Sequence, residues 1–141
     1  MEEVKGGIPP TVKVTTGQQK YKTVVHANGH GVIVDEPANM GGSNLGMDPF
    51  ALLLGSLGSC TAITIKMYAD RKGWELDSTT VELSIEREIV DGKERAEITT
   101  NILFTGNLSD EQKKRLLQIA HACPVHKTLL GEIVIVDKKL D

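Results

Sequence analysis

The feature that most constrains the fold is the stretch 50–65, where every residue is apolar or small and none is charged. Asp48 before it can cap a helix, Pro49 suits a first helical position, and Gly73 after it suits a helix end. We therefore predict one helix over residues 49–72. The 16 uncharged residues are fewer than the roughly 20 that cross a bilayer, so we interpret it as a buried helix and expect no membrane partner.

This helix is apolar on nearly every side, so it needs cover all round. Gly55, Ser56, Gly58 and Ser59 make one part of it thin, which lets another backbone approach closely. A chain of 141 residues forms a single modest domain, 1–141, and would struggle to bury such a helix alone. We therefore predict an obligate homodimer.

The remaining patterns predict an α+β fold. Two or three strands are expected over 11–35, a Gly-rich loop over 36–48 and a hairpin over 79–104, with its turn at Asp91-Gly92. The later elements are predicted as follows: a helix capped by Ser109 and Gln112, a second helix starting at Pro124 with Cys123 as its N-cap, and a last strand over 132–138.

Composition and the N-terminal sequence argue against nucleic-acid binding and against secretion. The net charge of -3 gives no electrostatic case for nucleic acid, and 4% aromatic residues give few surfaces for base stacking. The N-terminal stretch MEEVKGG has no apolar segment of the kind found in signal peptides. We therefore expect a cytoplasmic protein whose two cysteines are normally reduced.

The two thiols differ in their expected surroundings. Cys123, at a helix start, should meet free backbone amides that favour its thiolate. Cys60 lies in the middle of the long helix, where activation would have to come from a side chain elsewhere. A buried cysteine without such a partner is an inert core residue, and from its position alone Cys60 fits that interpretation as well.

The blocks DPFALLLGSLGSCTAITIKMYADRKGW and AHACPVHKTL, in this order and with their cysteines 63 positions apart, resemble the OsmC/Ohr family of peroxide-reducing proteins. The DPF and CPVH motifs resemble a less characterised OsmC-like branch. The resemblance covers nearly the whole chain. It implies antiparallel sheets around long central helices in an intertwined homodimer, with both cysteines of one chain in each site at the subunit interface.

The resemblance also implies an antioxidant stress-response enzyme, a thiol peroxidase without a cofactor. Cys60 would attack an organic hydroperoxide, or hydrogen peroxide, and become a sulfenic acid. Cys123 would resolve it as a disulfide, and a dithiol reductant would reset the pair. The apolar wall around the thiol suits an organic hydroperoxide, and Phe50 and Leu53 are candidates for the substrate pocket.

One part of the family pattern is missing. Members known for organic hydroperoxide reduction activate the first cysteine with an Arg–Glu pair, whose Glu directly follows the proline that starts the helix. Here that position is Phe50, and the nearest match to the place of the Arg is His30. His126, one helical turn from Cys123, and Glu36, at the start of the Gly-rich loop, are further candidates to support the thiols.

Two alternatives remain open. The Cys–x–x–His spacing of CPVH, with Cys60, His121 or His26, is one half of a zinc site, although structural zinc normally uses two ligand pairs and we expect no metal. The other alternative is a non-catalytic carrier that holds a small apolar ligand at the dimer interface, with the thiols as bystanders.

Overall fold

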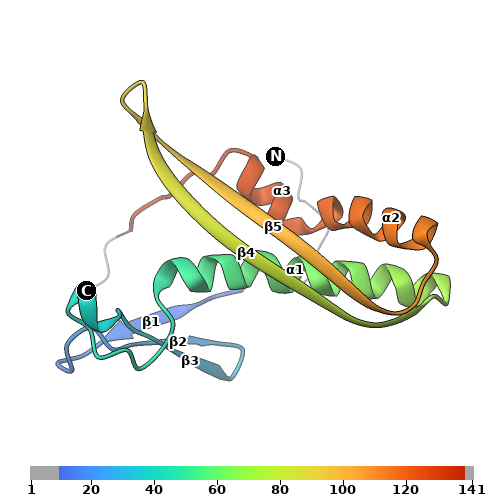
Figure 1. Ribbon diagram of the computed structural model, residues 1–141. Helices are drawn as coiled ribbons and strands as arrows, with labels where there is room; N and C mark the ends of the chain where they lie inside the picture. Colours follow the sequence, from blue (N-terminus) through green and yellow to red (C-terminus); the bar gives the residue numbers. More distant parts are fainter. Residues whose placement is uncertain (1–9, 139–141) are drawn as a thin grey trace. The chain divides into compact units, whose positions relative to one another are not determined.

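A computed structural model describes residues 10–138, and the chain divides into two compact units, one up to Leu53 and one from Leu54 onward. We call them unit 1 and unit 2. Three strands are followed by a long helix, a hairpin and two shorter helices, which confirms the α+β fold class (Figure 1). The N-terminal residues on which we based the absence of a targeting segment lie outside the described part.

Unit 1 is built on a three-stranded antiparallel sheet of order β1-β2-β3. The strands are β1 (Lys13–Thr16), β2 (Thr23–Ala27) and β3 (His30–Val34), all within the predicted range 11–35. Asn28 and Gly29 both have positive φ, of 54° and 79°, so they form the two-residue turn that matches the twist of the strands.

The loop after β3 is held by its own backbone contacts. The buried Asp35 carboxylate accepts the N–H groups of Glu36, at 2.8 Å, and Leu45, at 3.1 Å. A Cβ on Gly42 would lie 1.9 Å from the Glu36 carbonyl oxygen, so this position requires glycine. The segment is a loop as predicted, except for a short 3-10 helix, η1 (Ala38–Met40), which the sequence did not indicate.

The long helix α1 (Pro49–Lys72) begins and ends where the sequence predicts. The Asp48 carboxylate accepts the N–H of Ala51 at 2.8 Å, and Gly73, with φ 67°, adopts the left-handed conformation that ends it. Its buried residues recur about every fourth position, as one helix face requires: Leu57, Gly58, Thr61, Ile65 and Ala69. By length and composition alone α1 could cross a bilayer, but core helices of soluble proteins meet the same criteria.

Unit 2 combines most of α1 with a two-stranded sheet and two helices. Strands β4 (Glu75–Val90) and β5 (Lys93–Asn107) are longer than the predicted hairpin and turn at Asp91-Gly92, both with positive φ. Helix α2 (Asp110–Ile119) has the predicted capping box, and a 3-10 turn, η2 (Ala120–Ala122), leads to α3 (Pro124–Leu130). In Figure 1 the hairpin runs along α1 and α2, and its tip projects beyond them.

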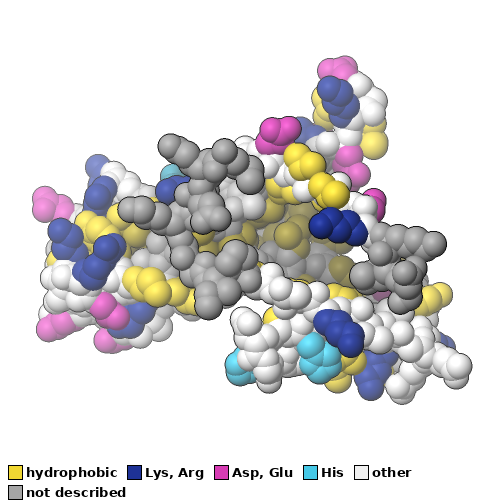
Figure 2. Space-filling model, turned by 180° about the vertical axis from the view of Figure 1, so that it is seen from behind, with side chains coloured by type: hydrophobic (Ala, Val, Ile, Leu, Met, Phe, Trp, Pro, Cys, Tyr) yellow, Lys and Arg dark blue, Asp and Glu magenta, His cyan; other side chains and the backbone are white. Residues whose placement is uncertain are grey.

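The core of unit 2 lies where α1, β4 and α2 meet. Its buried side chains are Ile65, Ala69, Leu76, Leu116 and Ala120, and partly buried residues, Tyr68 and Trp74 among them, pack around these. Figure 2 shows Lys and Arg side chains gathered with acidic ones at the end of unit 2 where α1 ends and α2 begins.

The predicted last strand, 132–138, does not form. This segment has no strand partner among residues 10–138, and its side chains 133–136 are exposed, Ile135 by 83%. Its composition is that of a strand, but a strand needs a neighbour to satisfy its backbone N–H and C=O groups. The described part of the chain offers none.

Candidate functional site

The two thiols meet in unit 2, although they lie 63 positions apart in the sequence. Cys60 lies in the middle of α1 and Cys123 is the N-cap of α3. Both are free cysteines, and they lie close enough that the Cys123 side chain raises the pKa of the Cys60 thiol. Cys60 is half-buried, whereas Cys123 is fully buried. A small molecule from solvent can therefore reach Cys60, with Cys123 directly behind it.

The start of α3 holds Cys123 in place. Pro124 fixes the first helical position, and the Cys123 sulfur accepts the N–H of His126 at 3.4 Å. This is the N-cap that the sequence predicts for Cys123. The sulfur thus occupies the position that a serine or aspartate oxygen fills in most helices.

The Cys60 sulfur has two hydrogen-bond partners besides Cys123: the backbone N–H of Val125 and the Thr64 hydroxyl. Thr64 lies one helical turn further along α1, a spacing that brings side chains together. Our expectation that the backbone offers Cys60 no help was wrong, because the contributing N–H belongs to α3, an element distant in sequence. Neither partner was identified from the sequence. The i+4 spacing of Thr64 was the only available signal.

Burial is the largest influence on the pKa of the Cys60 thiol, and it raises this pKa above the ordinary value. The hydrogen bond to Cys123 and the charge of a Cys123 thiolate raise it further, since both disfavour a Cys60 thiolate. The Val125 N–H and the Thr64 hydroxyl act in the opposite direction and only partly offset these effects. Cys60 is therefore mostly protonated at neutral pH.

His126 contributes to the site in an unexpected way. Its backbone N–H contacts the Cys123 sulfur, while its imidazole stacks on that of His121, with ring centroids 5.3 Å apart and planes 10° from parallel. His121 precedes Cys123 by two residues, so the stacked pair flanks the N-cap. Direct support of a thiolate by the His126 ring remains a prediction.

The other predicted site residues belong to unit 1. Glu36 follows the buried Asp35, and its carbonyl oxygen accepts the N–H of Asn44 at 3.1 Å. His30 is exposed at the start of β3. Phe50 and Leu53, in the first turns of α1, are both partly exposed. Unit 1 contains no cysteine, and the roles of these four residues remain predictions.

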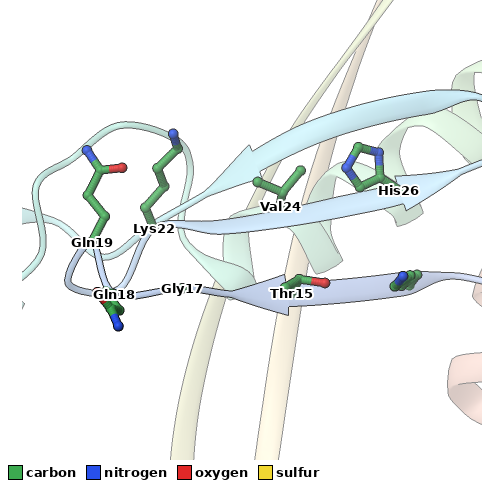
Figure 3. Close-up of a pocket in the computed structure, with 8 residues that line it drawn as sticks. Thr15, Gly17, Gln18, Gln19, Lys22, Val24 and His26 are labelled. Carbon is green, nitrogen blue, oxygen red and sulfur yellow. The ribbon is translucent and has the colours of Figure 1, made fainter.

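Neither of two surface cavities is lined by a thiol. The larger, of about 690 Å³, lies on the β1–β2 face of unit 1 (Figure 3). The residues that line it are mostly of polar types: Lys13, Thr15, Gly17, Gln18, Gln19, Lys22, Val24 and His26. The second, of about 410 Å³, lies between α1 and β4 in unit 2. The residues that line it are Ala62, Ile63, Lys66, Met67, Leu76, Asp77, Ser78 and Thr79.

The residues of CPVH do not assemble a zinc site within the described part of the chain. Across residues 10–138, no three His, Cys, Asp or Glu side chains come together in a way that could hold a metal ion. Cys60 and Cys123 are in contact with each other, and the two stacked imidazoles face one another. Within unit 2 the site thus offers two adjacent thiols.

Comparison with protein families gives one match: the model for OsmC-like proteins matches residues 41–137. This range includes α1, the hairpin and both cysteines. No curated protein sequence matches the chain.

Solved structures share the fold. An osmotic stress induced and detoxification response protein from Psychrobacter arcticus is 26% identical, with a TM-score of 0.68 over 89% of this chain and 90% of its own. An OsmC-like protein from Mycoplasma pneumoniae is 19% identical, with a TM-score of 0.76 over 88% and 89%. An organic hydroperoxide resistance protein OsmC from Legionella pneumophila is 18% identical, with a TM-score of 0.68 over 90% and 93%.

Proposed function

Because the chain belongs to the OsmC-like family, we propose that it reduces organic hydroperoxides with the paired thiols of Cys60 and Cys123. One observation carries the proposal: a half-buried thiol lies beside a second thiol that is fully buried and that raises its pKa. An oxidant reaches the first sulfur, and the second is already in place to form a bond with it. The hydroperoxide resistance proteins among the structural relatives support a peroxide-related role.

In the first step the Cys60 thiolate attacks the outer oxygen of the hydroperoxide ROOH. The O–O bond breaks, its electron pair leaves with the inner oxygen, and this alkoxide takes up a proton to become the alcohol ROH. Cys60 becomes a sulfenic acid. The Thr64 hydroxyl and the Val125 N–H stabilise the small fraction of thiolate that reacts, because both hydrogen bonds favour the charged sulfur.

In the second step the Cys123 sulfur attacks the sulfur of the Cys60 sulfenic acid. The S–O bond breaks, hydroxide leaves and is protonated to water, and a Cys60–Cys123 disulfide forms. A dithiol reductant then exchanges with this disulfide and restores both thiols while becoming a disulfide itself. Each cycle thus consumes one hydroperoxide and one dithiol and yields one alcohol, one water and one disulfide.

The assembly proposed for this function is a cytoplasmic homodimer. Apolar side chains remain exposed along α1, including Ile63 at 53% and Met67 at 61%. The unpaired segment 132–138 adds a further apolar stretch. A second copy of the chain would cover such surfaces, and an apolar seam near Cys60 would favour hydroperoxides with a fatty or aryl tail over hydrogen peroxide.

The test is turnover of cumene hydroperoxide with a dithiol reductant. Cys60→Ser removes the attacking sulfur and is expected to abolish turnover. Cys123→Ser is expected to leave the first step intact, so that a Cys60 sulfenic acid accumulates and can be trapped with dimedone. Unchanged turnover in Cys60→Ser, or no turnover in the unmutated protein, contradicts the peroxidase and favours the carrier alternative.

A further inference from the structure

A group of cationic and aromatic side chains lies where α1 ends, away from the thiols. The Tyr68 ring has three cations within 6 Å of its centroid: Arg115 at 5.5 Å, Lys72 at 5.6 Å and Arg71 at 5.8 Å. Trp74 meets the same ring edge-on at 5.6 Å. We call these five residues the Tyr68 cluster. It lies at the end of unit 2 where Figure 2 shows basic and acidic side chains together.

The positive charge of this cluster is not neutralised within the described part of the chain. Among residues 10–138, the ion pairs join Lys66 to Asp70 or lie within the hairpin, either between its two strands or within β5. None of them includes Arg71, Lys72 or Arg115. The three cations lie within 6 Å of one ring centroid, so any two of them are at most about 12 Å apart, which is close to the screening length of salt. The carbonyl end of α1 offsets part of the charge of Arg71 and Lys72, but Arg115 belongs to α2.

The cluster also offers hydrogen-bond donors. Arg115 Nε donates to the Tyr68 phenol oxygen at 3.1 Å, and Arg115 Nη1 donates to Gln118 Oε1 at 3.0 Å, which together orient the guanidinium. The phenol oxygen accepts from Arg115, so its own hydrogen is free to donate. The hydrogen bond from Arg115 also lowers the pKa of the Tyr68 phenol, which makes its O–H a stronger donor.

A phosphate group matches this arrangement. It carries one to two negative charges at neutral pH and several acceptor oxygens, and guanidinium groups bind it in a planar, bidentate manner. We propose that the Tyr68 cluster is a binding site for a phosphate group, held by Arg115, Arg71, Lys72 and the Tyr68 O–H. The group belongs either to a small phosphorylated molecule or to a phospholipid headgroup, which present the same chemistry. Cys60 lies eight residues earlier, about 12 Å along α1, so the site is separate from the thiols.

The chain carries its own reporter for this site. Trp74 is its single tryptophan and contacts the Tyr68 ring, so its fluorescence reports on the cluster alone. The full chain is titrated with inorganic phosphate, and sodium chloride at matched ionic strength serves as the control. A saturable change in emission with phosphate, and none with chloride, is the expected result. Glycerol 3-phosphate and vesicles that contain phosphatidic acid then distinguish the two sources.

Variants locate the binding. Arg115→Gln is expected to weaken phosphate binding at least tenfold, and Tyr68→Phe, which keeps the ring but loses the O–H, is expected to weaken it severalfold. Lys66→Gln is the matched control: it also removes one positive charge from unit 2, but its ammonium pairs with Asp70 at 2.7 Å. It is expected to bind phosphate unchanged. Circular dichroism checks that each variant is folded.

Three results would overturn the proposal: no saturable response to phosphate or glycerol 3-phosphate and no binding to vesicles, an equal response to chloride, or equal weakening by Lys66→Gln and Arg115→Gln. The last two would indicate only general screening of surface charge.

Discussion

At the scale of residues, the Cys60 sulfur is a thiol with competing neighbours. The Val125 N–H and the Thr64 hydroxyl favour its thiolate, while burial and Cys123 favour the protonated form and outweigh them. The protonation of Cys60 should therefore govern how fast a peroxide is consumed. Removing a group that favours the thiolate should slow this reaction.

The first consequence is a dependence on pH. The reactive form is the thiolate, and the pKa of Cys60 is raised above its ordinary value, so the thiolate fraction rises with pH throughout the neutral range. We expect the second-order rate constant of peroxide consumption to increase about tenfold per pH unit between about pH 6 and 8 and to level off only above the raised pKa. Stopped-flow kinetics measures it. A rate constant that is flat across this range would show that the thiolate is already formed.

The second consequence concerns Thr64. Thr64→Val keeps the branched shape but removes the hydroxyl that stabilises the Cys60 thiolate. The Thr64 hydroxyl is the weakest of the influences on the Cys60 pKa, so we expect that pKa to rise slightly further and the rate at neutral pH to fall severalfold. Titration of the thiol by its absorbance and the peroxide assay test both parts.

Ser59→Ala is the matched control for Thr64→Val. It also removes a hydroxyl from α1, but this hydroxyl donates to the Ser56 carbonyl at 3.1 Å and is adjacent to Cys60 in sequence only. The Ser59→Ala variant should consume peroxide at the rate of the unmutated protein. If the two variants behave alike, the hydroxyl of Thr64 has no specific role at Cys60.

The sequence predicted part of this site. The helix that starts at Pro124 placed Cys123 at an N-cap, because proline and a capping residue act locally. The meeting of Cys60 with Cys123 was implied only by the family resemblance, since no local rule joins residues 63 apart. The Val125 N–H escaped prediction for the same reason. Its contact with Cys60 depends on how α3 packs against α1.

At the scale of elements, α1 is positioned by a close approach to β4. A Cβ added to Gly58 would lie 2.7 Å from Leu83 Cδ1, whereas one added to Gly55 would meet nothing within 4 Å. The helix ends, the capping box of α2 and the Asp91-Gly92 turn were all predictable, because each depends on neighbouring residues. The strand expected over 132–138 was not, because a strand depends on a partner elsewhere.

The two glycines give a matched pair of variants. Alanine favours a helix over glycine by up to about 1 kcal/mol, and Gly55→Ala should gain most of this. Gly58→Ala gains the same but must displace the end of the partly buried Leu83 side chain, which costs about 1 kcal/mol, the low end for crowding. We expect Gly58→Ala to be the less stable variant by about 1 kcal/mol in urea unfolding. Equal stabilities would show that β4 does not constrain α1 at this point.

At the scale of the whole molecule, the exposed apolar surfaces require cover. Ile63 and Met67 on α1 and the unpaired segment 132–138 carry more exposed apolar side chain than a monomer would normally tolerate. The homodimer predicted from the length and composition of α1 rests on the same reasoning. The dimer itself remains a prediction.

A substitution in the C-terminal segment tests the dimer. Ile135 is 83% exposed within the single chain, so Ile135→Lys should have little effect on the fold of a monomer. If the segment packs against a second copy, the buried lysine should shift the protein from dimer to monomer in light scattering coupled to size exclusion. Asp137→Lys places the same charge at a polar position nearby and should remain dimeric. A protein that is monomeric before any substitution contradicts the prediction.

The central claim is that Cys60 and Cys123 act as one redox pair. Its most direct test is mass spectrometry of the intact and protease-digested chain after exposure to one equivalent of cumene hydroperoxide. We predict a chain that lacks two hydrogens and a peptide pair joined by a Cys60–Cys123 disulfide, which a dithiol reverses. A Cys60 that stays unmodified, or that reaches sulfinic acid without an intrachain disulfide ever forming, would contradict the claim.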